Sequence, residues 1–127
     1  MQPEHLPRVF RYMGGTIRAM GGNAYIIGGM PDHVHILTSL PVTISLADFV
    51  RNIKANSSRW IKGLDKQYHG FSWQEGYAAF SVSESMKETV LAYIDNQAAH
   101  HQKHSAHEEL ALFMKKNGIH NNSAANN

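Results

Sequence analysis

Residues 24–40 of this chain, AYIIGGMPDHVHILTSL, decide its fold. The runs Ala24–Ile27 and His33–Leu40 each have the length and apolar composition of a strand. Between them, Gly28–Asp32 combines glycines with a proline and an aspartate, which is typical of a turn. We therefore expect an antiparallel hairpin over this stretch.

Two histidines lie one residue apart in the second predicted strand. Because side chains alternate between faces along a strand, His33 and His35 point the same way, while Val34 and Ile36 point into the core. Imidazoles placed in this way can share one metal ion. The chain has nine histidines, so about 0.6 such pairs would arise by chance. A strand with two exposed or hydrogen-bonded histidines is therefore an open alternative.

Helical periodicity surrounds the hairpin. Apolar residues three and four positions apart predict an amphipathic helix over Leu6–Met20 and another over Leu46–Lys62, which Ser45 can cap. Later in the chain we expect a third strand and two further helices, over Tyr77–Val82, Met86–Gln102 and His107–Asn117. This order predicts an α+β fold in which helices pack on the faces of an antiparallel sheet.

Cations and hydroxyls gather on the polar sides of the first two predicted helices. Such a side is typical of a solvated helix, and it also suits a surface that follows the phosphates of a nucleic acid. The candidate DNA contacts are Arg11, Arg18, Arg51, Lys54, Ser57, Ser58, Arg59 and Lys62.

Composition limits the class of protein. A chain of 127 residues with 43% hydrophobic and 17% charged residues predicts one globular domain, residues 1–119, before a polar tail, 120–127, that we expect to be disordered. A net charge of +2 allows a phosphate-rich partner without requiring one. The absence of cysteine excludes thiolate chemistry and suits the cytoplasm. We expect neither a membrane span nor a secretory signal.

A second candidate group lies in the helix predicted after the third strand. Tyr93 and Gln97 are four residues apart and therefore share one helix face. A tyrosine hydroxyl can act as a covalent nucleophile, and an amide oxygen can complete a metal shell. A half-buried tyrosine beside an ordinary surface glutamine is the open alternative.

Three stretches in this order resemble the single-tyrosine HUH transposases, the family of small insertion-sequence and REP-associated tyrosine transposases. They are GGMPDHVHIL at residues 28–37, FSWQEGYAAFSV at 71–82, and YIDNQ at 93–97, which His100 and His101 follow. Lys54 with Ser57 and Ser58 also fits the middle helix of that family. The similarity covers residues 6–119, and three ordered motifs are more specific than any one of them.

The resemblance implies roles for individual residues. The implied metal ligands are His33, His35 and Gln97, and the implied nucleophile is Tyr93. Asp32 matches the motif without a clear role, and His100 and His101 would flank the site or contact DNA. The implied fold is HUH endonuclease-like, with a ferredoxin- or RRM-like core. Family members usually have a further N-terminal stretch, so the first strand of the sheet is expected to be missing here.

The resemblance also implies a reaction and its partners. The substrate would be single-stranded DNA flanked by a hairpin, cleaved and rejoined through a 5′-phosphotyrosine intermediate with Mg²⁺ or Mn²⁺ as cofactor. Relatives often work as homodimers in which the tyrosine helix of one subunit completes the histidine pair of the other, and REP-associated relatives can act as monomers. A homodimer is therefore expected, and a shared active site and a site within one chain both stay open.

Two alternatives remain at this point. Nucleotide hydrolases and transferases of the histidine-triad type also place histidines closely on a strand, but they need another histidine where this chain has Leu37. A catalytically impaired or domesticated DNA-binding relative of the same transposase family is the second alternative, and the missing first strand favours it. Covalent attachment of Tyr93 to DNA would distinguish an enzyme from a binding module.

Overall fold

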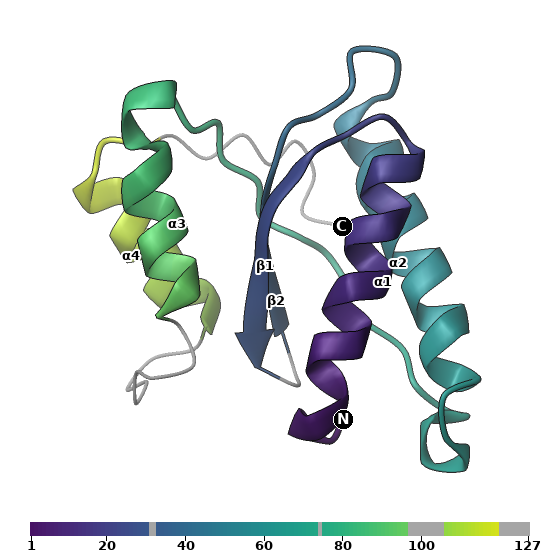
Figure 1. Cartoon of the computed structure of the whole chain (residues 1–127). Coiled ribbons are helices and arrows are strands. Elements are labelled where there is room, and N and C mark those ends of the chain that lie inside the picture. Colours follow the sequence, from purple (N-terminus) through teal and green to yellow (C-terminus); the bar gives the residue numbers. More distant parts are fainter. Residues whose placement is uncertain (31–32, 74, 97–105, 120–127) are drawn as a thin grey trace.

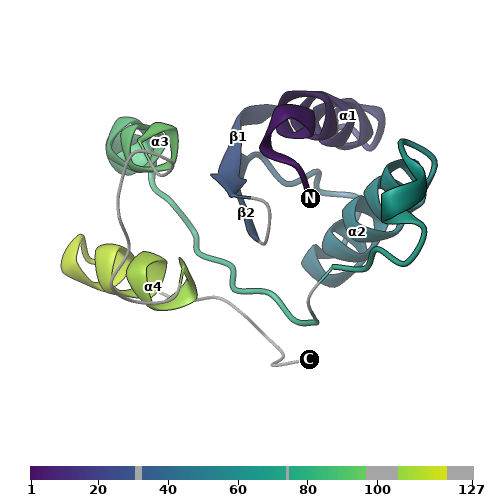
Figure 2. The same cartoon turned by 90° about the horizontal axis from the view of Figure 1, so that it is seen from below.

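The computed structural model describes residues 1–30, 33–73, 75–96 and 106–119. A two-stranded antiparallel hairpin stands at the centre, with α1 and α2 on one side and α3 and α4 on the other (Figure 1, Figure 2). In chain order the elements are η1 (Pro3–His5), α1 (Leu6–Ala19), β1 (Ala24–Met30), β2 (His33–Thr38), α2 (Leu46–Lys62), η2 (Lys66–Tyr68), η3 (Glu84–Met86), α3 (Lys87–Asp95) and α4 (Ala106–Lys116). The predicted α+β class is confirmed.

The hairpin extends further than its composition predicted. Gly28 pairs with His35 and Met30 with His33, so β1 continues through most of the stretch that was expected to be a turn. The prediction that the turn begins at Gly28 is therefore wrong, because Gly28 and Gly29 pair with His35 and Val34 in the ladder to β2. Pro31 and Asp32, the remainder of the predicted turn, lie outside the described residues.

The prediction of a third strand over Tyr77–Val82 is wrong. Among the described residues the sheet has two strands, and within this segment only Phe80 forms an isolated bridge. Phe80 and Val82 instead pack against the buried cluster beneath α3. The apolar composition of this segment correctly predicted burial. Formation of a strand also requires a neighbouring strand in register, and composition does not show whether one is present.

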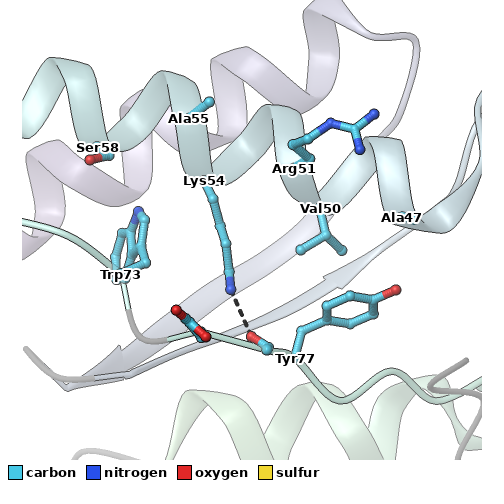
Figure 3. Close-up of a pocket in the computed structure, with 10 residues that line it drawn as sticks. Ala47, Val50, Arg51, Lys54, Ala55, Ser58, Trp73 and Tyr77 are labelled. Atoms are coloured by element: carbon cyan, nitrogen blue, oxygen red, sulfur yellow. Dashed lines mark hydrogen bonds between the residues drawn. The ribbon is translucent and has the colours of Figure 1, made fainter. Parts of the chain in front are cut away.

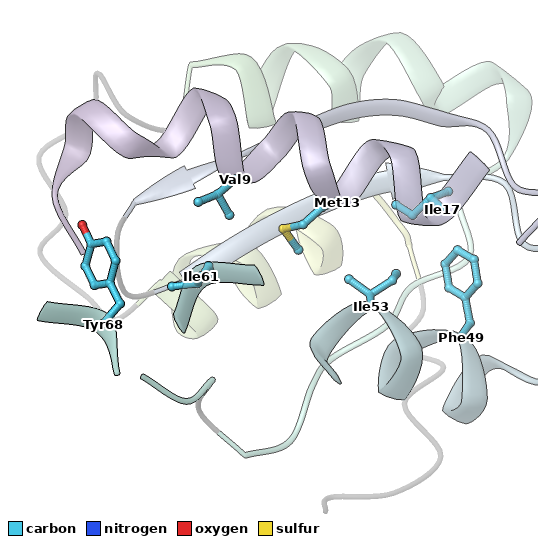
Figure 4. Packing of buried hydrophobic residues seen from close by; sticks show 7 residues of the cluster. All are labelled: Val9, Met13, Ile17, Phe49, Ile53, Ile61 and Tyr68. Carbon is cyan, nitrogen blue, oxygen red and sulfur yellow. The ribbon is translucent and has the colours of Figure 1, made fainter. Parts of the chain in front are cut away.

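The helices α1 and α2 form the larger core, and the sequence predicted both. Their buried side chains recur at four-residue steps and pack against each other and against Tyr68 of η2 (Figure 4). The buried residues of the two helices are Val9, Met13, Ile17, Phe49, Ile53 and Ile61. The predicted N-cap of α2 is confirmed, since the Ser45 hydroxyl accepts a hydrogen bond from the Asp48 amide at 3.1 Å. In the described part of the chain, no helix is both long and apolar enough to cross a membrane.

A second, smaller core lies on the other face of the hairpin. Leu37 of β2 packs there with Val90 and Ile94 of α3 and with Met114 and Ile119 at the end of α4. The predicted helices at Met86–Gln102 and His107–Asn117 thus exist as α3 and α4, although 97–105 lies outside the described residues. The predicted disordered tail, 120–127, also lies outside them.

One glycine determines how closely α3 approaches the hairpin. A Cβ atom on Gly28 would lie 3.1 Å from Ile94 Cγ2 and 3.2 Å from the Ile94 carbonyl oxygen. Both distances are shorter than ordinary van der Waals contact, so any side chain at this position would push α3 away. Because Gly28 pairs with His35, this contact also determines how closely α3 approaches the histidines.

We expect two glycine-to-alanine substitutions to change stability in opposite directions. Gly28→Ala should lower the free energy of unfolding by about 1–3 kcal/mol, because the new methyl group overpacks the α3 contact. Gly15→Ala, in the middle of α1 with nothing within 4 Å of a new Cβ, should raise it by about 0.5–1 kcal/mol. Urea unfolding of both variants measures the two effects. A stability gain in Gly28→Ala would contradict the close approach of α3.

Candidate functional site

The two histidines of β2 lie side by side on the face that α3 covers. Their ring centroids are 5.1 Å apart, and the His35 side chain is buried while that of His33 is half-buried. The intervening Val34 and the following Ile36 pack against the α1–α2 core on the opposite face. Strand alternation therefore places the histidines as the sequence predicted.

His35 is held in its neutral form. Burial, together with the positive charge that His33 can carry, lowers the pKa of His35 from 6.5 to about 4. Its Nδ1 atom is buried and has no hydrogen-bond partner in the described part of the chain. A neutral imidazole keeps a lone pair, which is the form that binds a metal ion.

Tyr93 lies close to this pair within the same chain. It occupies the last two turns of α3, and its ring centroid is 6.4 Å from that of His35, with 30° between the ring planes. Its ring also stacks on Phe113 of α4, with 4.1 Å between the centroids and 24° between the planes. The structure thus brings together residues from β2, α3 and α4. Sequence reasoning missed Phe113. The apolar spacing of Leu110, Phe113 and Met114 indicates a buried helix face, but it does not indicate contact with Tyr93.

Several other predicted site residues lie outside the described part of the chain. These are Gln97, the predicted third metal ligand, and also Asp32, His100 and His101. Among the described residues, no group of three histidine, cysteine or acidic side chains is placed to hold a metal ion. His33 and His35 fit a divalent ion as two of its ligands, since both present imidazole nitrogens on one face.

The predicted DNA contacts lie on α1 and α2, across the hairpin from the histidines. Beside α2 is an open groove of about 550 Å³, lined by aromatic side chains of the 73–77 segment and by cations of the helix (Figure 3). The Lys54 ammonium donates a hydrogen bond to the Gly76 carbonyl oxygen at 2.7 Å, and Arg51 forms an ion pair with Asp48. The exposed cations among the candidates are Arg11, Arg18, Arg51, Arg59 and Lys62, and Lys54 and Ser58 are half-buried.

The prediction that Ser57 lies on this exposed side is wrong. Ser57 is completely buried, because it continues the four-residue stripe of Phe49, Ile53 and Ile61. Its hydroxyl donates to the Ile53 carbonyl oxygen at 2.6 Å and accepts from Trp73 Nε1 at 2.9 Å. Ser57 therefore satisfies a buried indole and fixes one wall of the groove, and it is not available to DNA.

The low pKa of His35 predicts a loss of stability in acid. In the unfolded chain the His35 imidazole takes up a proton near pH 6.5, and in the folded chain only near pH 4. The contribution of neutral His35 to the free energy of unfolding is therefore complete above pH 6.5 and is lost as the pH falls toward 4. The full loss is about 3 kcal/mol. Urea unfolding with a chelator present should show a flatter pH profile for His35→Gln than for the unsubstituted chain.

Exposed His69 offers the matched control. His69→Gln makes the same substitution at an exposed position, and we expect it to keep the steepness of the pH profile of the unsubstituted chain. Profiles of equal steepness for His35→Gln and the unsubstituted chain would contradict the neutral, buried state of His35.

Comparisons with known proteins indicate the family of this chain. The sequence model of a family described as IS200-like transposases matches residues 1–97, a range that includes β2 and the whole of α3. The ISDra2 transposase TnpA of Deinococcus radiodurans is 33% identical over 73 residues, which are 54% of this chain and 52% of that protein. The chain thus spans about half the length of the curated relative it matches. No solved structure matches it. Because the family match covers more than half of the chain, the chain belongs to the IS200-like transposase family.

Proposed function

We propose that this chain is a metal-dependent transposase that cleaves and rejoins hairpin-flanked single-stranded DNA through a 5′-phosphotyrosine intermediate. The observation that carries the proposal is the approach of Tyr93 to His35, with 6.4 Å between ring centroids. A phenol beside two imidazoles combines a covalent nucleophile with a metal-binding pair. Family membership and the transposase relative support the same reaction class.

The residues that would hold the cofactor are His33, His35 and, as the predicted third ligand, Gln97. Two nitrogens and an amide oxygen suit Mn²⁺, and Mg²⁺ is the more oxygen-preferring alternative. When bound, the ion supplies the positive charge that polarises the scissile phosphate. The neutral state of His35 supports this assignment, because no proton competes for its lone pair at neutral pH.

The protein's own part in the reaction is carried by Tyr93. Its phenolic oxygen attacks phosphorus, the bond from phosphorus to the 3′-oxygen breaks, and a 5′-phosphotyrosine forms. The phenol gives up its proton to a base, and the departing 3′-oxygen takes one to become a hydroxyl. Another 3′-hydroxyl then attacks the phosphotyrosine and releases Tyr93. The phosphodiester linkage is conserved throughout, so the reaction needs no nucleotide cofactor.

The groove beside α2 is the proposed contact for the unpaired strand. It combines two aromatic rings, Trp73 and Tyr77, with the cations Arg51 and Lys54, as proteins that bind single strands do. The hydrogen bond from Trp73 to Ser57 fixes the orientation of the indole. From this groove the backbone runs past the hairpin to α3 (Figure 2). A strand that follows this segment would lead toward Tyr93.

Removal of one oxygen atom tests the proposed chemistry. The substrates are labelled hairpin-flanked oligonucleotides taken from the DNA around the gene of this chain. In the presence of Mn²⁺, we expect the purified chain to form a covalent adduct with them that is visible on denaturing gels. Tyr93→Phe should abolish the adduct, because it removes the nucleophile and keeps the ring stack on Phe113. Tyr25→Phe, at an exposed tyrosine of β1, is the control and should form the adduct normally.

The same experiment separates the proposal from its alternative. DNA binding without an adduct would support a catalytically impaired or domesticated DNA-binding relative. A persistent adduct in Tyr93→Phe would assign the nucleophile to another residue. If the chain neither binds this DNA nor forms an adduct with it, both functions are contradicted.

Salt dependence tests the groove. Arg51→Gln should weaken single-strand binding and reduce the slope of log K against log salt by about 0.7, the value for one lost phosphate contact on a single strand. Lys66→Gln, in η2 and away from the groove-lining residues, removes the same charge and should leave the slope unchanged. Fluorescence anisotropy over a salt series measures both. Equal slopes for the two variants would remove Arg51 from the DNA contact.

A further inference from the structure

A tryptophan in the segment between η2 and η3 is fixed to the buried side of α2. Trp73 lines the groove beside α2 and is half-buried. Its Nε1 atom donates a hydrogen bond to the Ser57 hydroxyl at 2.9 Å. The Phe71 ring packs perpendicular to the indole, with 5.0 Å between the centroids and 85° between the planes. These two contacts restrict the orientation of an indole that still lines the groove.

Ser57 occupies a position that burial alone would give to an apolar side chain. It follows Phe49 and Ile53 in the buried stripe of α2 and is completely buried. An alanine at this position would suit the helix better and would bury no hydroxyl. The Ser57 hydroxyl donates to the Ile53 carbonyl oxygen, which leaves its lone pairs to accept from the indole. The hydrogen bond to Trp73 therefore accounts for a serine in this stripe.

A second contact fixes the same segment to α2. The Lys54 side chain extends from the helix and donates to the Gly76 carbonyl oxygen at 2.7 Å. Trp73 lies on one side of this side chain and Tyr77 on the other (Figure 3). Gly76 has a φ of 83°, a left-handed conformation that favours glycine and turns the chain between the two aromatic residues. Lys54 and Ser57 thus hold the segment at two points and preorganise this wall of the groove.

The chemistry of this wall suits an unpaired base. An indole offers a planar surface on which a base stacks, and the neighbouring cations of α2 suit the phosphates of the same strand. A base inside a duplex already stacks on both neighbours, so an unpaired base is the one with a free face. A purine has two fused rings, as indole does, and therefore covers more apolar surface than a pyrimidine. Because the indole is already oriented, little conformational freedom is lost when the base binds.

We propose that Trp73 stacks on one unpaired purine base of the DNA strand, and that Ser57 is the positioning residue that orients the indole for this contact. Ser57 acts through Trp73 and does not touch the DNA. The proposal rests on the proposed function, since it takes an unpaired DNA strand as the ligand of the groove. It depends neither on the metal ion nor on Tyr93.

Strands that carry a single base test the stacking. Short strands of abasic sugar-phosphate units have adenine, guanine, cytosine, thymine or no base at the centre, and fluorescence anisotropy with a chelator present measures their affinity. The strand with adenine should bind about fivefold or more tightly than the strand without a base, and both purines should bind more tightly than the pyrimidines. Affinity that does not depend on the base would overturn the stacking role. Equal or tighter binding of the pyrimidines would overturn the assignment of a purine.

Tryptophan fluorescence locates the bound base. The chain has two tryptophans, so Trp60→Phe leaves Trp73 as the single reporter. In this variant the strand with adenine should quench the fluorescence more strongly than the strand without a base, because the base stacks directly on the indole. Base-dependent binding without quenching would place the base elsewhere and overturn the role of Trp73.

A double-mutant cycle tests the positioning role of Ser57. Ser57→Ala removes the acceptor of the indole N–H and should reduce the advantage of adenine over no base by about threefold, as for one lost hydrogen bond. Trp73→Phe keeps a ring without the N–H, so Ser57→Ala should have no further effect in that background. Ser72→Ala, at the exposed serine next to Trp73, is the control and should keep the full advantage. An equal effect of Ser57→Ala in both backgrounds would overturn the positioning role.

These outcomes are distinct from failure of the proposed function. Both binding tests are made without a metal ion and do not depend on cleavage. A purine preference in a chain that forms no covalent adduct would support this inference and contradict the cleavage chemistry. An adduct in a chain whose affinity does not depend on the base would support the chemistry and overturn this inference.

Discussion

The close approach of α3 to the hairpin at Gly28 is the contact on which the candidate site depends. Ile94 lies where a side chain at position 28 would stand, and Gly28 pairs directly with His35 on the neighbouring strand. Because Tyr93 precedes Ile94 on α3, the same approach places the phenol ring beside the imidazole. Because residue 28 has no side chain, α3 can approach β1 closely enough to place Tyr93 beside His35.

The hairpin separates two kinds of packing. On one face, α1 and α2 build the larger core from long apolar stripes. On the other face, the shorter α3 and α4 share a smaller core with Leu37, and the histidines lie on this side. Buried area stabilises the first face more strongly, so we attribute the fold mainly to α1 and α2 and the placement of Tyr93 to the smaller cluster. The side that does the proposed chemistry is therefore the less strongly packed one.

Local patterns predicted the elements well, and their tertiary relations poorly. Ser45 and the stripe of α2 specify a helix through contacts within a few residues, so its bounds were correct. Tyr77–Val82 has the composition of a strand, but pairing depends on a neighbour that composition does not reveal. Ser57 was misplaced because its hydroxyl suggested a polar surface, whereas its position in the helical stripe required burial. The stack of Phe113 on Tyr93 joins distant segments, and no local pattern specifies it.

The central claim is the proposal that Tyr93 and the two histidines belong to a single metal-dependent site. Anomalous diffraction from crystals soaked in Mn²⁺ tests it most directly. The account predicts a manganese peak within coordinating distance, about 2.0–2.3 Å, of ring nitrogens of both His33 and His35, with a Tyr93 side chain facing it. Well-diffracting crystals with no manganese at the pair, or with Tyr93 turned away from both histidines, would contradict the account.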